Sequence, residues 1–369
     1  MSCSSEEDLC YLKKALLLSK TAKGRTFPNP AVGAVVVKND TIVGLGATQK
    51  YGGAHAEKVA LLQAGESAKG ATLYVTLEPC CHFGKTPPCT DAVIAAGIRR
   101  VVVSVLDPNP LVSGKGVEQL RNAGIEVSSG LLEKESNLIN EDFFWSITKK
   151  RAWVTLKLAM TLDGRIADEN NSSKWITGEK SRRFVHELRR CHAAVAVGRT
   201  TFEVDNPQLT VRHKKGYFPA RIIFTSYDRI SSDSYFYKHA HEARSIIVIL
   251  GGVKRDIIKT ESGIELWYTG NDSQNDKLFS FLEMAYKQGI TSVFVEGGQR
   301  VASSFLEAGL VNRIYFFYGN KLLGNGKDGI LFSSGLPMNS CISLKEMEFK
   351  KIEDDIVVTG KPEISLNCG

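Results

Sequence analysis

The sequence predicts an α/β protein of two domains, and three observations support this. The chain has 369 residues, whereas a single domain commonly holds about 150. Helix and strand patterns alternate along it, as in proteins whose sheets are covered by helices. The basic run Lys149-Lys150-Arg151, which is either a linker or a solvated turn, separates two such series. We therefore expect one domain over residues 1–148 and another over residues 149–369.

The first series opens with a helix and a β-hairpin. Residues 6–20 place four leucines on one helical face, and residues 31–37 and 41–46 flank the turn-forming pair Asn39-Asp40. Residues 71–77 form a continuous apolar run of the kind found in a buried strand. The remaining expected elements are helices over 55–65, 88–96, 115–123 and 131–145 and strands over 100–105 and 125–129.

The second series begins with the strand pattern of residues 153–160, WVTLKLAM. Short apolar runs predict further strands over 193–197, 220–224, 245–250, 292–296 and 313–318. Between them, helical patterns cover 180–190, 276–288 and 299–308. Together they predict a second α/β domain of about 220 residues.

Composition and charge narrow the class of protein. Hydrophobic residues make up 43% and charged residues 24%, which excludes collagen, a disordered chain and a disulfide-rich miniprotein. The net charge of +7 suits an anionic small molecule and is no strong indication of nucleic-acid binding. The acidic N-terminus lacks a signal-peptide pattern, and no uncharged apolar stretch reaches the ~18 residues of a membrane span. We expect a cytoplasmic protein with reduced cysteines and with neither nucleic acid nor membrane as a partner.

A candidate zinc site lies in the first domain. His55 opens a predicted helix, Cys80 follows a buried strand and Cys89 begins another helix. One imidazole and two thiolates are three protein ligands, which leave one position open for water, and helix N-termini favour the anionic thiolates. Zinc would make that water acidic near neutral pH, and Glu57, two residues from His55, would serve as general acid and base.

The spacing is similar to the zinc-deaminase signature, H-x-E followed by P-C-x-x-C. It departs in one respect, because Cys80 and Cys89 are nine residues apart and not three. Cys81 and His82 are alternative ligands; Cys80 is preferred because it directly follows Pro79, as in the signature. The competing interpretation is a group of buried thiols beside a helix-capping histidine.

A second candidate site lies in the other domain, where Gly297-Gly298 separates a predicted strand from a predicted helix. Glycines at a helix N-terminus favour a bound phosphate, although a plain tight turn has the same pattern. No G-x-G-x-x-G follows a strand, so a Rossmann fingerprint is not supported. Arg189 and Arg212 would bind a phosphate through bidentate hydrogen bonds or else lie solvated on the surface.

Several longer segments resemble one known family, the bifunctional riboflavin-biosynthesis deaminase/reductases. Those that resemble its deaminase half are PNPAVGAVVV (28–37), HAE (55–57), TLEPCCHFGKTPPC (76–89) and DPNP (107–110). Those that resemble its reductase half are KLAMTLDGRIA (157–167), SKWITG (173–178), VGRTTFEVDNPQLTVR (197–212) and VEGGQRVASSFLEAGL (295–310). The chain departs from the family at Cys81, where Ser is common, and at Asn206, within a usual Asp-Asp-Pro pattern.

The resemblance implies the fold, the two reactions and their cofactors. A cytidine-deaminase-like α/β/α domain would bind Zn²⁺ and hydrolytically deaminate 2,5-diamino-6-ribosylamino-4(3H)-pyrimidinone 5′-phosphate. A dihydrofolate-reductase-like α/β domain would then use NADPH to reduce the ribosyl side chain to ribityl. The expected partners are this phosphorylated ribosylaminopyrimidine and further copies of the chain in a homo-oligomer.

The same resemblance implies residue roles. The substrate contacts are Asn29 in the first domain and Ser173, Arg189, Leu209, Arg212 and Glu296 in the second. The cofactor contacts are Ala159, Trp175, Thr201, Asp205, Ser226, Gly298, Gln299, Arg300, Val301, Ala302, Ser303 and Ser304. Simpler interpretations are a turn before proline for Asn29, core packing for Trp175 and a helix cap for Thr201.

The reductive step also needs a group that handles protons near the sugar. Lys157 lies on the first strand of the second domain, and Glu296 ends a later strand. We expect Glu296 to hold the substrate and Lys157 to polarise or protonate it. The competing interpretation is a structural Lys–Glu ion pair.

Two other functions fit parts of this pattern. A tRNA or mononucleotide deaminase fused to an unrelated domain predicts the P-C-x-x-C spacing, which this sequence lacks. A non-catalytic ligand-binding regulator predicts the loss of Glu57 or of a zinc ligand, and all of these residues are present. The bifunctional enzyme is therefore the prediction.

Overall fold

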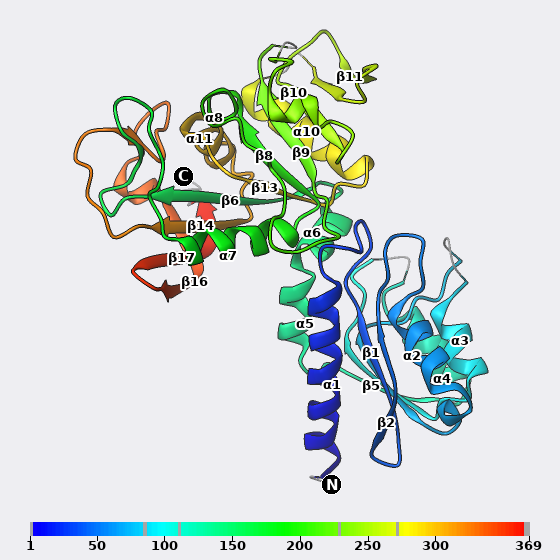
Figure 1. Ribbon diagram of the computed structural model, residues 1–369. Coiled ribbons are helices and arrows are strands. Elements are labelled where there is room, and N and C mark those ends of the chain that lie inside the picture. Colours follow the sequence, from blue (N-terminus) through cyan, green and yellow to red (C-terminus); the bar gives the residue numbers. More distant parts are fainter. Residues whose placement is uncertain (1–2, 84–86, 110–111, 228–229, 271–272, 365–369) are drawn as a thin grey trace. The chain divides into compact units, whose positions relative to one another are not determined.

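The computed structural model describes residues 3–83, 87–109, 112–227, 230–270 and 273–364 (Figure 1). The chain divides into two compact units, Met1–Lys150 and Arg151–Gly369, and the boundary falls within the basic run. Parts of two quoted motifs, residues 84–86 and Pro110, lie outside the described residues. No helix in the described part of the chain is both long and apolar enough to span a bilayer.

A five-stranded sheet forms the centre of the first unit, in the order β2-β1-β3-β4-β5 over the described residues. Strands β1 (Gly33–Lys38) and β2 (Thr41–Ala47) form the expected hairpin, and β1 also pairs antiparallel with β3 (Thr72–Leu77). Strands β4 (Arg100–Val105) and β5 (Glu126–Ser129) continue the sheet in parallel. The structure thus has a strand at each place where the sequence predicted one in this unit.

Helices cover both faces of this sheet. Helix α1 (Cys3–Ala22) packs Leu12 and Ala15 against one face, and Figure 1 shows it on the opposite side of the strands from α2, α3 and α4. These three helices are α2 (Ala56–Ala64), which continues into the 3₁₀ turn η1 (Gly65–Ala68), α3 (Cys89–Ala95) and α4 (Lys115–Asn122). Because successive side chains of a strand point to opposite faces, β1 contributes Val35 to one core and Val36 to the other.

The single closing helix expected over 131–145 is wrong. The structure has two helices there, α5 (Glu133–Ile139) and α6 (Glu141–Lys149), which are divided at Asn140. The buried side-chain amide of Asn140 donates to the carbonyl oxygen of Ala31 at 2.8 Å and accepts from its N–H at 2.9 Å. A hydrophobic period along the sequence does not reveal this break, because the bonding partner is distant in the chain.

The second unit is built on a ten-stranded sheet, counted over the described residues, in the order β11-β12-β10-β9-β8-β13-β6-β14-β17-β16. Its six central strands run parallel to one another and match the six predicted strands. They are β6 (Trp153–Met160), β8 (Ala194–Gly198), β9 (Ala220–Thr225), β10 (Ser245–Ile249), β13 (Ser292–Val295) and β14 (Arg313–Tyr318).

Helices also cover both faces of this second sheet, as expected when parallel strands are buried. On one face α10 (Gln274–Lys287) and α11 (Gln299–Glu307) pack around Phe281 and Phe305. On the other face α7 (Glu179–Arg190), α8 (Arg199–Asp205) and α9 (Tyr235–Lys238) pack around Val185, Phe202 and Phe236.

Several elements of the structure were not predicted from the sequence, and most of them are short or lie at the sheet edges. They are α8, α9, β7 (Arg165–Ala167), β11 (Arg255–Lys259), β12 (Glu265–Thr269), β15 (Lys327–Asp328), β16 (Ile342–Ile352), β17 (Asp355–Ile364) and the 3₁₀ turn η2 (Met338–Ser340). Strand β16 is mostly exposed and rich in Lys and Glu, and a register shift between Lys345 and Glu348 interrupts the alternation of its apolar residues, so no simple period-2 pattern marks it in the sequence. Its backbone pairing with β17 determines its conformation.

Candidate active sites

The three expected zinc ligands lie together in the first unit. His55 immediately precedes α2, Cys80 follows β3, and Cys89 is the first residue of α3. The Nδ1 atom of His55 is 3.6 Å from the Sγ atom of Cys80 and 3.3 Å from that of Cys89, and the three ligand atoms lie within 4.8 Å of one another. Hydrogen bonds from Cys89 and His55 lower the pKa of the Cys80 thiol, which favours a thiolate at this place.

These distances suit a tetrahedral zinc ion. With Zn–S bonds of about 2.3 Å and Zn–N bonds of about 2.0 Å, neighbouring ligand atoms are about 3.5–3.8 Å apart. The observed separations of 3.6 and 3.3 Å therefore require only small movements of the side chains. Cys81 and His82, the alternative ligands, are not part of this group.

Glu57 lies in the first turn of α2, and its residue is only 3% exposed. Burial raises the pKa of its carboxyl group to about 7, and the negative charge of Cys80 adds to the rise. A carboxyl group with a pKa near neutrality exchanges protons in both directions at neutral pH, as a general acid and base must.

Glu78, for which the sequence predicted no role, anchors the loop that carries Cys80. The buried carboxylate of Glu78 accepts hydrogen bonds from the N–H groups of Asp107, Gly114 and Val117 at 3.1, 3.0 and 3.1 Å. These bonds attach the Glu-Pro-Cys turn to the beginning of α4 and so position one zinc ligand.

Asn29 lies in a turn that precedes β1. Its N–H donates to the carbonyl oxygen of Thr26 at 2.8 Å, and the Thr26 hydroxyl donates to the carbonyl oxygen of Asn29 at 2.9 Å. The side-chain amide of Asn29 has no hydrogen-bond partner among the described residues, so the turn leaves it available to a ligand. Its role as a substrate contact stays a prediction.

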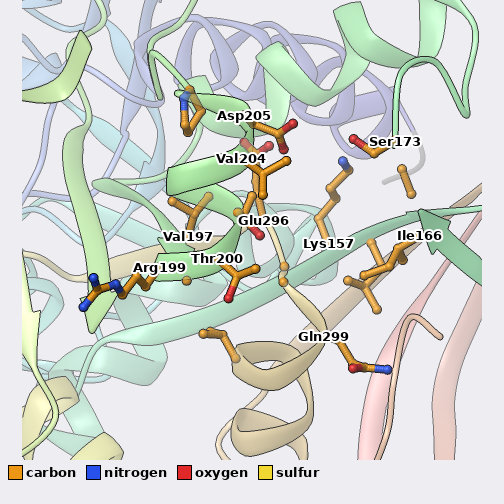
Figure 2. A pocket seen from close by; sticks show the side chains of 18 of the residues that line it. Lys157, Ile166, Ser173, Val197, Arg199, Thr200, Val204, Asp205, Glu296 and Gln299 are labelled. Carbon is orange, nitrogen blue, oxygen red and sulfur yellow. The ribbon is translucent and has the colours of Figure 1, made fainter. Parts of the chain in front are cut away.

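A cavity of about 1150 Å³ lies in the second unit, beside the carboxyl ends of β6, β8 and β9 and the residues after β13. Open parallel sheets bind ligands at this edge, and the volume exceeds the roughly 300–1,000 Å³ typical of drug-sized ligands. Figure 2 shows Lys157, Asp205, Glu296 and Gln299, from four different parts of the fold, around this space. The expected site residues that line it are Lys157, Ala159, Ser173, Trp175, Arg189, Thr201, Asp205, Leu209, Arg212, Ser226, Glu296, Gly298, Gln299, Arg300, Val301 and Ser304.

Two expected cofactor contacts, Ala302 and Ser303, are not among the residues that line the cavity. Both are buried in α11, on the side that packs into the protein. The Ser303 hydroxyl accepts a hydrogen bond from the N–H of Leu331 at 2.9 Å, which indicates a structural role. A motif read along a helix mixes its faces, because side chains that point the same way are three or four residues apart.

The glycine pair adopts the geometry of an anion cradle. Gly298 precedes α11 with a φ of +74°, a conformation that favours glycine. A Cβ atom at this position would lie 2.8 Å from the Thr201 hydroxyl oxygen. No side chain of the described residues caps the first N–H groups of α11, which leaves them available to an anion at this end of the cavity.

Trp175 lies at the rim of the cavity and is 58% exposed, so the core-packing interpretation is wrong. The guanidinium group of Arg182 lies over its ring, 4.3 Å from the centroid. This cation–π contact orients the indole without burying it.

Glu296 is paired with Arg189 and not with Lys157. Its two carboxylate oxygens accept from Nε and Nη2 of Arg189, the second at 2.9 Å. Lys157 forms no salt bridge or hydrogen bond with any described residue; its ammonium lies 5.8 Å from the centroid of the Phe317 ring. Burial lowers the pKa of Lys157, and the charge of Glu296 only partly opposes this. The direct Lys157–Glu296 ion pair is therefore absent.

Comparison with known proteins agrees with both halves of this description. A family model of the RibD C-terminal domain matches residues 152–358, and a model of the cytidine and deoxycytidylate deaminase zinc-binding region matches residues 5–105. Over 357 residues the chain is 46% identical to the riboflavin biosynthesis protein RibD of Aquifex aeolicus, an alignment that covers 96% of this chain and 98% of that one. The chain belongs to the RibD family.

Solved RibD structures share this fold over nearly their whole length. A Thermotoga maritima protein, described as a diaminohydroxyphosphoribosylaminopyrimidine deaminase/5-amino-6-(5-phosphoribosylamino)uracil reductase, is 40% identical with a TM-score of 0.82, over 97% of this chain and 99% of that one. RibD of Acinetobacter baumannii is 32% identical with a TM-score of 0.81 over the same fractions. The expected fold class, a cytidine-deaminase-like domain followed by a RibD reductase domain, is confirmed.

Membership of the RibD family also confirms the expected class of enzyme. The chain is a bifunctional deaminase and reductase of riboflavin biosynthesis, with zinc and NADPH as its cofactors. Three residues close to the expected site residues were not predicted from the sequence: Glu78, Arg182 and His186, the last of which lines the cavity. For His186 a local signal existed, since it lies three residues before Arg189 and therefore on the same side of a helix.

Proposed function

We propose that the first unit deaminates diaminohydroxyphosphoribosylaminopyrimidine and that the second reduces 5-amino-6-(5-phosphoribosylamino)uracil with NADPH. These are the reactions named for the Thermotoga maritima relative. The observation that carries the proposal is the pairing, on one chain, of a His-Cys-Cys group beside a buried glutamate with a large cavity that contains a buried lysine. We assign the deaminase to residues 1–148 and the reductase to residues 149–369.

In the deaminase, the chain's own residues would hold the metal and move the proton. His55, Cys80 and Cys89 hold a zinc ion, which supplies the Lewis acidity that makes a bound water acidic near neutral pH. Glu57 would take a proton from the attacking water and deliver protons to the ring nitrogen and to the amine that leaves as ammonia. Asn29 contributes a free side-chain amide to bind the pyrimidine.

In the reductase, the cavity would orient the cofactor against the sugar. When bound, NADPH would supply the hydride that reduces C1′ of the ring-opened ribosyl group. Gly298 and the N-terminus of α11 offer N–H groups to its phosphates, and Trp175 offers an exposed ring at the rim. Lys157 supplies the proton that accompanies the hydride, because burial makes its ammonium a better acid.

The other expected site residues that line the cavity take the roles that the resemblance implies. The further cofactor contacts are Ala159, Thr201, Asp205, Ser226, Gln299, Arg300, Val301 and Ser304, and the substrate contacts are Ser173, Arg189, Leu209, Arg212 and Glu296. For Arg189 the salt bridge to Glu296 favours a supporting role, since three of its five N–H groups already have partners.

Incubation of the purified protein with the diaminopyrimidine phosphate tests the proposal. Without NADPH we expect ammonia and the deaminated pyrimidine; with NADPH we expect a product two hydrogens richer and one NADPH consumed per molecule. Mass analysis distinguishes the three compounds. Release of ammonia without any NADPH oxidation would contradict the assignment of the second unit.

We also propose that the protein is a homo-oligomer that works in the cytoplasm. Strand β16 lies at an edge of the sheet and exposes Met347 and Phe349, which are 62% and 82% exposed (Figure 1). An edge strand with apolar side chains suits pairing with a second copy. Cys10 and Cys341 form no disulfide bond within the described part of the chain, which suits a reducing compartment. Sedimentation of Phe349→Glu against the unchanged protein tests the assembly, and a monomeric wild-type protein would contradict it.

A further inference from the structure

Arg212 is attached to the wall of the cavity through one histidine. Its Nε–H points at Nε2 of His186 at 3.1 Å, and its backbone N–H points at Nδ1 of the same ring at 3.2 Å. His186 lies on α7, is 5% exposed and lines the cavity together with Arg212. A neutral imidazole has one acceptor nitrogen: the tautomer protonated at Nδ1 accepts from the Arg212 side chain, and the other tautomer accepts from its backbone N–H.

The segment that carries Arg212 needs such an attachment. Residues 206–213 include three non-glycine residues in the left-handed region, Asn206, Leu209 and His213, with φ values of +41°, +53° and +73°. Such conformations persist only where the surroundings impose them. One turn of α7 does so at two points, since His186 binds Arg212 and the nearby Arg189 donates from Nη1 to the carbonyl oxygen of Thr210 at 2.9 Å.

Arg189 and Arg212, two of the arginines that line the cavity, differ in how many of their N–H groups already have partners. Arg189 already donates to both carboxylate oxygens of Glu296 and to Thr210. The Nη groups of Arg212 have no partner among the described residues, and its side chain and backbone N–H face only the ring nitrogens of His186 there. Of this pair, Arg212 therefore keeps an uncommitted fork of N–H donors, the geometry that binds a phosphate bidentately.

We propose that His186 is a positioning residue that fixes Arg212 so that its two Nη groups face the phosphate of the reductase substrate. This inference rests on the proposed function, because it requires a phosphorylated substrate in this cavity. His186 acts through Arg212 and touches neither the sugar carbon nor the nicotinamide.

The ring must stay neutral to accept this bond, and its surroundings ensure that it does. Four titratable or charged groups face the ring of His186. They are Arg189 on α7, Arg212 and His213 at the end of the segment 206–213, and Glu296 just after β13. Burial is the main cause that lowers the pKa of His186, to about 4, and the two guanidinium charges add to it. Above that pH the imidazole remains an acceptor.

Steady-state kinetics of the full-length, zinc-loaded protein test this role. His186→Phe keeps a ring but loses the acceptor, and we expect the KM for 5-amino-6-(5-phosphoribosylamino)uracil to rise about tenfold, the order expected when one hydrogen bond to a charged group is lost. The kcat, the KM for NADPH and ammonia release by the first unit stay unchanged. With the dephosphorylated substrate, His186→Phe and wild type behave alike.

Two further measurements distinguish a positioning role of His186 from general support of the fold. One is rescue by an amide side chain, and the other is a double variant with Arg212. His186→Gln and His186→Asn offer an amide oxygen near the place of Nε2 or Nδ1, and at least one of them recovers most of the affinity. Adding His186→Phe to Arg212→Ala raises the KM no further. The matched control is His192→Phe, at a buried histidine just beyond the same helix that bonds Leu188 and Thr155 away from the cavity, and it leaves the KM unchanged.

The outcomes separate this inference from the proposed function. If wild type does not reduce the uracil substrate, the proposed function fails. If wild type does so and His186→Phe has a normal KM, or loses affinity equally for phosphorylated and dephosphorylated substrates, the positioning role is wrong. If His186→Phe does not fold, His186→Met, which also lacks a strong acceptor, replaces it with the same expectations.

Discussion

The two sites of this protein are assembled in different ways. In the zinc site every ligand lies at the beginning of a helix or just after a strand, and short motifs specify all of them. The reductase cavity draws on β6, α7, α8, β9 and α11 and on several loops, and its charges acquire their roles from pairing across the fold. Local motifs are therefore sufficient where a metal selects the ligands, whereas a cavity that orients two organic molecules depends on tertiary contacts.

Removal of a zinc ligand should have the largest effect of all. We expect Cys89→Ala to lose both stoichiometric zinc and measurable deamination, because two ligands do not retain zinc in a catalytic site. Metal analysis and ammonia release measure the two effects. The matched control is Cys81→Ser, which should retain both zinc and deamination. Loss of zinc in this variant would show that Cys81, and not Cys80, is a ligand.

Replacement of the general acid and base should separate chemistry from metal binding. Glu57→Gln is expected to keep its zinc and to lose roughly 10²- to 10⁴-fold in the rate of deamination. NADPH oxidation with the deaminated substrate serves as the internal control and should not change. Near-normal ammonia release would show that another group moves the proton.

The two buried charges of the cavity should respond in opposite ways. Glu296→Gln leaves the guanidinium of Arg189 without its counter-charge, with side chains only 10% and 12% exposed in this pair, and should cost about 3–5 kcal/mol of stability along with reduction. Lys157→Met removes a buried ammonium that has no ion-pair partner among the described residues, and should abolish reduction without lowering Tm.

Thermal unfolding and NADPH oxidation, measured on the same samples, check this contrast. A fall in Tm for Lys157→Met as large as that for Glu296→Gln would indicate that the lysine has a structural partner. Normal reduction by Lys157→Met would remove it from the mechanism.

The smallest expected effect concerns pH. The pKa of His186 is lowered from 6.5 to about 4 in the folded protein, so the unfolded chain binds more protons between these values and stability falls as the pH drops through that window. The decline in Tm from about pH 7 to about pH 4.5 should therefore be steeper for wild type than for His186→Gln. Parallel curves for the two proteins would mean that His186 titrates normally.

Much of the fold follows from the sequence by itself. The alternation of apolar runs predicted the strands of the first sheet and the six central strands of the second, because buried strands carry their apolar side chains wherever the chain is placed. Edge strands such as β16 and the break at Asn140 were not predictable in this way. They depend on backbone pairing and on a side-chain bond to Ala31, 109 residues away.

The two sites also differ in how much of each could be predicted from the sequence. The residue types and spacing of His55, Cys80 and Cys89 predicted them as zinc ligands, because metal coordination restricts both residue type and local geometry. Only the tertiary structure decided that Glu296 pairs with Arg189, 107 residues away, and that Lys157 is left without an ion-pair partner among the described residues. The energy of a buried charge depends on which opposite charge the fold brings within reach, and a linear sequence does not contain that distance.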